Sequence, residues 1–459
     1  MRGVWGMLLV CGVLLGAVLF SARAEGQVVR PNVLLVVTDD QRATNTMWAM
    51  PKTLSTFAGG TKYTNAFATT PLCCPSRATI LTGRYAHNTG VKRQSSRPLD
   101  PTTLFPRLLQ EAGYRTGMAG KFMNGWPFET PPPYFDRWAK LCVGCGRDPF
   151  VFDVDGTPTA RFGYSNGIIG GYARQFLRAF ERNDSAPWFL YVTPTDPHRP
   201  WTPTPRYANT DFPEWYGNPA VLEKNRADKP PFVRQGRRYG LGGARRVRTG
   251  QLRELKAVDD MVGRLAAQLT NLNERSRTLL IFTSDNGFLW AEHGIGSGRT
   301  AGQKRLPYTA SVQVPLLVRR PSGPRPNTVH RLVGNVDIAP TVLEAAGIRP
   351  DPRKPPLDGR SLFDSQRRGR LLLEYWGRDS GIPSWGSIRT RKYQYVGYYE
   401  DDEVTTTFRE YYDLVDDPWQ LENLFRDGDP TNNPDISEIR ARLARDRVCV
   451  GTDPPFACP

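Results

Sequence analysis

The feature that most constrains the fold of this chain is the continuous apolar run at residues 33–38, Val-Leu-Leu-Val-Val-Thr. Polar residues bound it on both sides, Asn32 before it and Asp39 after it. A strand that is buried on both faces has this pattern, as in a parallel sheet that helices cover. Similar runs recur at residues 188–193, 278–283 and 315–318. The sequence therefore predicts several buried strands of one sheet.

Helical patterns lie between these runs. The clearest covers residues 251–272, where Leu252, Leu255, Val258 and Val262 keep a helical period. Strands that alternate with helices are typical of an α/β domain. With 459 residues, of which 39% are hydrophobic, the chain is long enough for more than one lobe, since single cores stop growing near ~250 to 300 residues.

A second, smaller lobe is expected after the connector at residues 351–356, Asp-Pro-Arg-Lys-Pro-Pro. Short segments with strand character follow it at residues 371–375, 387–390, 392–398 and 411–414. Residues 434–447 have helical character. We therefore expect a catalytic domain over residues 25–350 and an α+β lobe with an antiparallel sheet over residues 351–459.

The first 24 residues have the order of a secretory signal peptide. Arg2 precedes an apolar run at residues 4–20, and Ala22-Arg23-Ala24 follows. A basic start, a short apolar segment and a small-x-small cleavage site define such signals. A membrane anchor is the alternative, but about 17 apolar residues that end at Ala-x-Ala favour cleavage. We expect cleavage after Ala24 and a secreted or extracytoplasmic protein without stable membrane insertion.

Six cysteines lie outside the signal segment: Cys73, Cys74, Cys142, Cys145, Cys449 and Cys458. An oxidising compartment permits disulfides, and we favour one between the last two and another between the middle two. Half of a zinc site is the alternative for Cys142-x-x-Cys145, but no second cysteine pair completes it. For one of the adjacent Cys73 and Cys74, a reactive role is favoured over a structural one.

The formal net charge of +16 implies attraction to polyanions. An exported protein meets acidic or sulfated polysaccharide more readily than nucleic acid, so we expect no nucleic-acid partner. The basic residues are densest at residues 234–253, where seven arginines are interleaved with glycines. A solvated loop is the alternative interpretation of that segment.

Polar residues follow three of the apolar runs. Asp39 and Asp40 follow the first, a loop that contains His198 follows the second, and Asp285 and Asn286 follow the third. In open α/β sheets, ligands collect at the carboxyl ends of the strands. The four Asp and Asn side chains offer only oxygen atoms, which suit calcium or magnesium and do not suit zinc. One acidic pair alone would be read as a helix cap, but two pairs after buried strands favour a metal site.

The motif at residues 73–77, Cys-Cys-Pro-Ser-Arg, places a nucleophile near a helix start. Proline suits the first turn of a helix, because its missing N–H would be unpaired there anyway. The N–H groups of such a helix end favour an anion. We therefore expect Cys73 to face an anion site.

This motif, followed by Thr-Gly-Arg at residues 82–84, resembles the signature of the type I sulfatases, in which the cysteine is converted to Cα-formylglycine. The resemblance extends over nearly the whole chain after the signal, with landmarks at residues 32–41, 118–121, 188–200, 283–287, 302–315, 336–341 and 412–424. It implies an alkaline phosphatase-like α/β fold, with a large mixed, mostly parallel sheet flanked by helices. It also implies a formylglycine-generating enzyme as a partner during maturation.

The resemblance implies a role for each residue of the site. Position 73 would carry an aldehyde hydrate with two hydroxyls: one attacks sulfur, and deprotonation of the other later expels sulfate and restores the aldehyde. Arg77 would hold the hydrate, and His198 would protonate the leaving alcohol. Lys121 and Lys304 would bind sulfate oxygens.

The implied metal is Ca²⁺, with Mg²⁺ as the alternative. It would lower the pKa of the attacking hydroxyl and polarise a sulfate oxygen. Its ligands would be Asp39, Asp40, Asp285, Asn286 and the residue made from Cys73. His293 would border the substrate pocket.

The segment after the Gly-Lys pair departs from many arylsulfatases, which carry a histidine where this chain has Met123. Residues 120–124, Gly-Lys-Phe-Met-Asn, instead resemble the N-acetylglucosamine-6-sulfatases and the heparan sulfate endosulfatases. A secreted sulfatase for a sulfated sugar or polysaccharide is therefore the leading hypothesis. A phosphodiester or phosphonate monoester hydrolase with the same nucleophile is one alternative. An inactive protein that binds polyanions is another.

Overall fold

The computed structural model describes residues 3, 30–296, 303–321, 326–377 and 381–459. The predicted signal peptide and its cleavage site, apart from Gly3, lie outside the described residues. Within those described ranges, no helix is long and apolar enough to cross a membrane.

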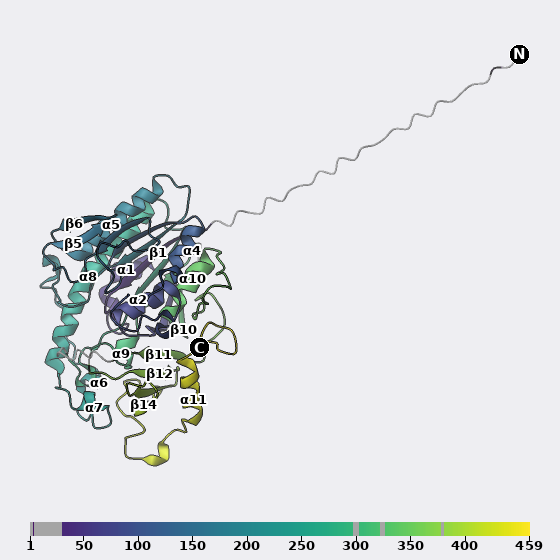
Figure 1. Ribbon diagram of the computed structural model, residues 1–459. Coiled ribbons are helices and arrows are strands. Elements are labelled where there is room, and N and C mark those ends of the chain that lie inside the picture. Colours follow the sequence, from purple (N-terminus) through teal and green to yellow (C-terminus); the bar gives the residue numbers. More distant parts are fainter. Residues whose placement is uncertain (1–2, 4–29, 297–302, 322–325, 378–380) are drawn as a thin grey trace.

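A ten-stranded mixed sheet forms the centre of the molecule, in the order β10-β2-β9-β8-β1-β7-β3-β4-β5-β6 (Figure 1). At its middle, β1 (Asn32–Thr38) runs parallel to both β7 (Trp188–Thr193) and β8 (Thr278–Ser284). The other strands are β2 (Thr61–Phe67), β3 (Arg115–Gly120), β4 (Arg137–Leu141), β5 (Phe150–Val154), β6 (Thr157–Arg161), β9 (Leu316–Arg319) and β10 (Asn327–Gly334). The predicted large mixed sheet is confirmed.

The direction of β9 differs from the expectation of a parallel strand. This strand pairs antiparallel with both of its neighbours, β2 and β8. Burial on both faces produces the apolar run at residues 315–318, and burial does not depend on strand direction. The pattern therefore located the strand correctly and could not orient it.

Helices cover both faces of the sheet, and the side chains of β1 alternate between the two layers. Val33, Leu35 and Val37 pack in one core with α2 (Cys73–Thr82), α4 (Phe105–Glu111) and α10 (Ile338–Ala345). Leu34 and Val36 pack in the other core with α5 (Ser165–Glu181) and α8 (Leu241–Asn271). The short helices are α1 (Pro51–Thr56), α3 (Ala86–Thr89), α6 (Pro219–Leu222), α7 (Pro231–Arg234) and α9 (Thr309–Val312). This sandwich explains why β1 has no polar face.

The arginine-rich segment is mostly helical and not a loop. Helix α8 begins at Leu241, ten residues before the predicted start at residue 251. Glycine lowers helix propensity by about 1 kcal/mol relative to alanine, and Gly242, Gly243 and Gly250 hid the first turns from the sequence pattern. Tertiary contacts outweigh this cost: Gly250, for example, packs closely against Trp201.

After the connector, a four-stranded antiparallel sheet forms, in the order β11-β12-β13-β14, as expected. Its strands are β11 (Leu371–Tyr375), β12 (Trp385–Arg389), β13 (Tyr393–Tyr399) and β14 (Thr406–Asp413), and α11 (Ser437–Asp446) packs against it. The predicted disulfides, Cys142–Cys145 and Cys449–Cys458, are both present. Figure 1 shows this smaller sheet at one end of the molecule, beside α9.

Candidate active site

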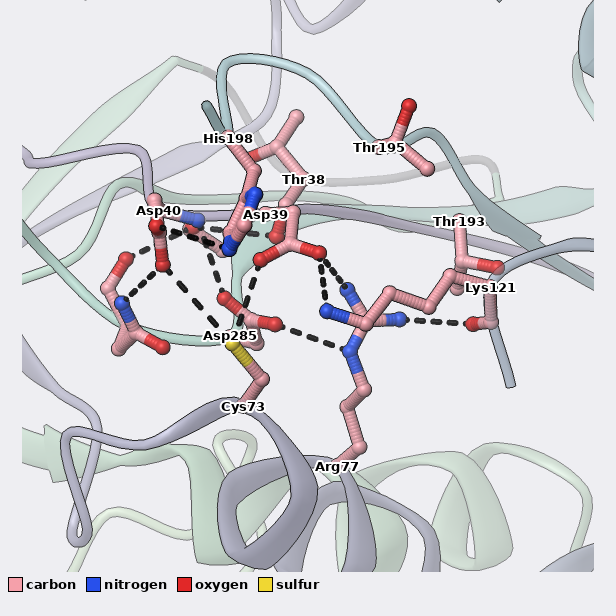
Figure 2. A network of polar contacts seen from close by, with 12 residues as sticks. Thr38, Asp39, Asp40, Cys73, Arg77, Lys121, Thr193, Thr195, His198 and Asp285 are labelled. Carbon is pink, nitrogen blue, oxygen red and sulfur yellow. Dashed lines mark hydrogen bonds and ion pairs between the residues drawn. The ribbon is translucent and has the colours of Figure 1, made fainter. Parts of the chain in front are cut away.

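The carboxyl ends of β1 and β8 bring the predicted oxygen ligands together (Figure 2). The N–H of Asp285 donates to the Thr38 carbonyl at 3.0 Å, and the N–H of Asp40 donates to Oδ1 of Asp285 at 3.1 Å. Asp40 has a left-handed backbone with φ 70°, which turns the chain at the end of β1. One side-chain atom each of Asp39, Asp40, Asp285 and Cys73 lies within 4.8 Å of the others.

Cys73 is the first residue of α2, as the proline two residues later predicts, and points at this cluster (Figure 2). Its Sγ donates to Oδ1 of Asp39 at 3.3 Å. Burial and the nearby carboxylates of Asp285 and Asp39 raise the pKa of the thiol to about 12, although Lys121 and Lys304 oppose the shift. The thiol is therefore protonated at neutral pH.

Arg77 lies one turn further along α2, fully buried beneath the cluster. Its Nε donates to Oδ2 of Asp285 at 2.9 Å, and its Nη1 donates to the carbonyl of Lys121 at 2.8 Å. Its Nη2 lies 3.5 Å from Oδ2 of Asp39 and makes no hydrogen bond with the described residues. Arg77 therefore links α2 to the ends of three strands, and its Nη2 keeps both N–H groups free of hydrogen bonds with the described residues.

Two lysines place their ammonium groups in the cluster around the cysteine. Lys121 directly follows β3, and its Nζ is paired with Oδ2 of Asp39. Lys304 Nζ lies 2.7 Å from Oδ1 of Asp40 and 3.0 Å from Cys73 Sγ. Burial raises the pKa of the Asp39 carboxyl, but Lys121, His198 and the other cations outweigh it and bring the pKa far below its usual value. The site therefore holds an ionised Asp39 carboxylate next to the ammonium group of Lys121.

His198 lies in the loop after β7, partly exposed above the cluster (Figure 2). Its Nδ1 lies 2.7 Å from the carbonyl oxygen of Arg199. Since a carbonyl can only accept a hydrogen bond, Nδ1 carries the proton. The other nitrogen, Nε2, lies 3.7 Å from Oδ2 of Asp40, so it is the atom that can gain and lose a proton at the site.

The donor set fits a hard divalent cation. Three carboxylates and an amide converge here, and calcium and magnesium prefer such oxygen ligands. Asn286 donates from Nδ2 to Oδ1 of Asp40 at 2.7 Å, whereas its own Oδ1 is buried and has no hydrogen-bond partner among the described residues. A bound cation would supply the missing partner for the amide oxygen of this side chain, which already contacts Asp40.

A cavity of about 360 Å³ opens above Cys73, and three predicted residues line it: Asp39, Lys121 and His198. The sequence analysis missed Arg147, which also lines this cavity and whose Nη2 donates to the carbonyl of Arg199 at 2.7 Å. The available signal was a cation two residues after the Cys142-x-x-Cys145 motif. Asn124 also lines the cavity.

Met123 and Cys74 lie close in sequence to predicted site residues, but both pack in the core. Met123 is buried in the core that includes α2, so no polar side chain reaches the site from that position. Cys74 is buried in the same core, and its Sγ donates to the carbonyl of Asn124 at 3.3 Å. Neither side chain lines the cavity above Cys73.

His293 lies elsewhere, in the short 3-10 helix η4 (Glu292–Gly294). Its Nδ1 lies 2.8 Å from Oε2 of Glu223, and its ring centroid lies 4.1 Å from that of Tyr308. It lines a separate cavity of about 330 Å³. The structure therefore brings nine of the predicted site residues together and places His293 apart from them.

The sequence matches those of known protein families. The sequence model of the Sulfatase family matches residues 31–348. The chain belongs to the sulfatase family. A second model, "N-sulphoglucosamine sulphohydrolase, C-terminal", matches residues 300–448 of this sulfatase, a range that includes the smaller sheet.

Among its relatives, the human N-acetylglucosamine-6-sulfatase is 28% identical over 506 residues, covering 97% of this sulfatase and 89% of the relative. The Drosophila melanogaster "Extracellular sulfatase SULF-1 homolog" is 30% identical over 381 residues, which cover 79% of this chain. The alignments span only 34% and 48% of the Drosophila protein and its Caenorhabditis elegans counterpart.

Solved structures share the fold over most of the chain. One is described as a complex with its substrate D-glucosamine-2-N,6-O-disulfate; it has a TM-score of 0.72 and 25% identity and covers 91% of this sulfatase and 96% of that chain. The phosphonate monoester hydrolase from Silicibacter pomeroyi has a TM-score of 0.70 and 20% identity, covering 91% and 95%. At that identity the second likeness concerns the fold alone.

Proposed function

We propose that this chain is a secreted enzyme that hydrolyses sulfate esters of a sulfated carbohydrate, with a formylglycine made from Cys73 as its nucleophile. The observation that carries the proposal is the position of Cys73 at the N-terminus of α2, 3.3 Å from Asp39 and 3.0 Å from Lys304. Membership of the sulfatase family and the N-acetylglucosamine-6-sulfatase relatives support it. The extracellular relatives support secretion. Cleavage after Ala24 stays a prediction from the sequence.

A formylglycine-generating enzyme would convert Cys73 during maturation. The hydrated aldehyde supplies two hydroxyls, one to attack sulfur and one whose later deprotonation expels sulfate. Arg77 holds the hydrate in place, because its Nη2 is the nitrogen that its carboxylate and carbonyl partners leave uncommitted. Asp39, Asp40, Asp285 and Asn286 would bind Ca²⁺, with Mg²⁺ as the alternative, and such a cation would polarise a sulfate oxygen and lower the pKa of the attacking hydroxyl.

The remaining residues act on the substrate. Lys121 and Lys304 offer buried ammonium groups to the sulfate oxygens, on which negative charge increases in the transition state. His198 donates the proton from Nε2 to the leaving alcohol, because the Arg199 carbonyl commits Nδ1 to another hydrogen bond. Its position in the wall of the cavity, beside Lys121, suits this role. His293 lies in a different cavity, and its contribution to substrate binding stays a prediction.

The test combines mass spectrometry with turnover. The protein is produced with a formylglycine-generating enzyme, the peptide that contains Cys73 is weighed, and activity is measured on glucosamine 6-sulfate and other defined sulfated sugars. We expect the aldehyde at position 73 and sulfate release, with no release by Cys73→Ala. An unmodified thiol in fully active protein would overturn the mechanism.

Two further measurements separate the alternatives. Turnover of nitrophenyl phosphodiesters or phosphonate monoesters that far exceeds turnover of nitrophenyl sulfate would identify a phosphorus hydrolase. Inertness toward the whole sulfated-sugar panel, with the aldehyde present, would instead identify a binding protein. The domain proposal, residues 25–350 and 351–459, is tested by limited proteolysis, which is expected to cut within residues 351–356.

A further inference from the structure

A groove at the edge of the large sheet, away from Cys73, is lined by a concentration of cations. Its volume is about 1120 Å³, and its walls come from β10, residues 365–370, the turn between β12 and β13, Val415 and α11. Seven of its lining residues are basic and none is acidic. They are Arg331, Arg367, Arg368, Arg370, Arg391, Lys392 and Arg442. We call this site the basic groove.

Three of these cations are neutralised by carboxylates and hold the walls together. Arg368 pairs with Asp337 at 2.7 Å, and Arg370 pairs with Asp446 at 2.7 Å. Arg442 pairs with a glutamate of its own helix, one turn earlier. The first two ion pairs connect the segment at residues 365–370 to η5 (Asn335–Asp337), which directly follows β10, and to α11.

The other four cations have no carboxylate partner among the described residues. Arg331 donates only to the backbone carbonyls of Leu362 and Asp364. The side chains of Arg367, Arg391 and Lys392 are exposed and make no hydrogen bond or ion pair within the described ranges. The basic groove therefore has four positive charges that no carboxylate of the described residues neutralises.

The basic groove is separate from the candidate active site. None of the residues assigned to the nucleophile, the metal site or the sulfate lines it. β10 lies at one edge of the ten-stranded sheet, whereas β1, β8, β7 and β3, which carry the active-site residues, are central. A ligand in the basic groove would leave the cavity above Cys73 accessible.

We propose that the basic groove binds a sulfated polysaccharide chain, of which a distant ester is the substrate of the active site; this inference rests on the proposed function. Exposed ion pairs are individually weak. A ligand that carries a negative charge on many units can engage several cations at once and gains affinity from their linkage. A volume above the range of about 300 to 1,000 Å³ for small-molecule pockets also favours a chain over a single sugar.

The lining of the basic groove argues against single-stranded nucleic acid. Proteins that bind single strands stack the bases on aromatic side chains. Tyr393 is the one Phe, Tyr or Trp residue among the residues that line this groove, which also include His330. Its ring already stacks on Tyr411, at 5.3 Å between centroids and 13° between planes. The basic groove thus offers charge without a free stacking platform.

The test uses a double charge reversal, Arg391→Glu with Lys392→Glu, whose exposed side chains make no contact that the fold needs. The matched control is Arg264→Glu with Lys224→Glu, which changes the net charge equally at two other exposed sites. Both pairs are placed in the Cys73→Ala background, so that binding of fluorescent heparin is measured without turnover. We expect about ten-fold weaker heparin binding for the groove pair and little change for the control pair.

A second arm uses active protein. The groove pair is expected to raise KM for a polymeric sulfated substrate and to leave kcat/KM for nitrophenyl sulfate unchanged. Heparin affinity that is equal for the groove and control pairs would overturn the proposal, as would DNA of equal charge that competes as well as heparin. Loss of heparin binding only in the groove pair would support the site even if no sulfate ester were hydrolysed, so the two proposals can fail separately.

Discussion

Arg147 and His198 donate hydrogen bonds to the same carbonyl oxygen, that of Arg199, each at 2.7 Å. The first donor follows the Cys142–Cys145 disulfide, and the second is the proposed proton donor. Because one acceptor orients both groups, the disulfide loop and the histidine form one wall of the cavity above Cys73. The geometry of the proton donor therefore depends on a segment more than 50 residues earlier in the sequence.

Replacing Arg147 tests this connection. We expect Arg147→Ala to lower kcat/KM roughly ten-fold, since a hydrogen bond that involves a charged group contributes about 1.5 to 3 kcal/mol. Arg147→Lys keeps the charge and is expected to recover part of the loss. The measurement is kcat/KM on a sulfated sugar across pH, and a profile that is identical in all three proteins would contradict the shared-acceptor interpretation.

Removing His198 should affect substrates according to their leaving groups. For a sugar sulfate, whose alcohol needs a proton to leave, His198→Ala is expected to lower kcat by about 10² to 10⁴-fold. Nitrophenolate leaves without help, so nitrophenyl sulfate should lose far less. Steady-state rates on both substrates check this, and equal losses would assign His198 to another step.

Chelation should remove both activity and stability. A cation that binds only the folded protein raises the unfolding temperature by mass action. We expect the unfolding temperature to fall after treatment with EDTA and to recover when Ca²⁺ is added. Asn286→Ala removes the amide oxygen that has no partner and should weaken Ca²⁺ binding roughly ten-fold or more, since affinity depends on the number of ligands. Calorimetric titration of the stripped protein measures this, and unchanged affinity would exclude Asn286 as a ligand.

The stability of the protein should depend on the protonation of His87. Its Nδ1 lies 2.8 Å from Oε2 of Glu374 and its Nε2 lies 3.0 Å from the Cys449 carbonyl. Burial lowers the pKa of His87, but Glu374, the Cys449 carbonyl and Asp358 together outweigh burial, and the net shift is upward from 6.5. Because the folded protein binds this proton more tightly, the stabilisation is complete below pH 6.5 and is lost as the pH rises through the raised value.

The variant His87→Gln isolates this effect. It leaves the Glu374 carboxylate buried without its cation, which costs about 3 to 5 kcal/mol in comparable pairs. Urea unfolding at several pH values between 5 and 9 is the measurement. We expect the variant to be less stable than the parent at low pH, with the difference shrinking at high pH. A difference that stays constant over the range would show that folding does not shift the pKa of His87.

Prediction from the sequence was most accurate for features that a single physical cause determines. The apolar runs located β1, β7 and β8 to within about one residue, because strands buried on both faces cannot hold polar side chains. The oxygen ligands followed from their place at the ends of those strands. Both disulfides followed from counting cysteines.

Features that depend on tertiary contact were not predictable in this way. The start of α8 is stabilised by packing that outweighs its glycines, and the direction of β9 leaves no trace in its apolar pattern. Arg147 lines the cavity only because its loop folds over the segment after His198. The basic groove combines residues from segments more than 100 positions apart, which no local pattern reveals.

The alternation of β1 between two cores also protects the chemistry of the site. A shift of one residue in the pairing of β1 would move Asp39 and Asp40 by about 3.3 Å and would exchange the side chains of the two layers. Val33 and Leu35 would then face α5 and α8, and Leu34 would face α2. A molecule with misplaced aspartates would thus also have two mispacked cores. In this protein, the core packing that stabilises the fold therefore also disfavours any register of β1 that would misplace Asp39 and Asp40.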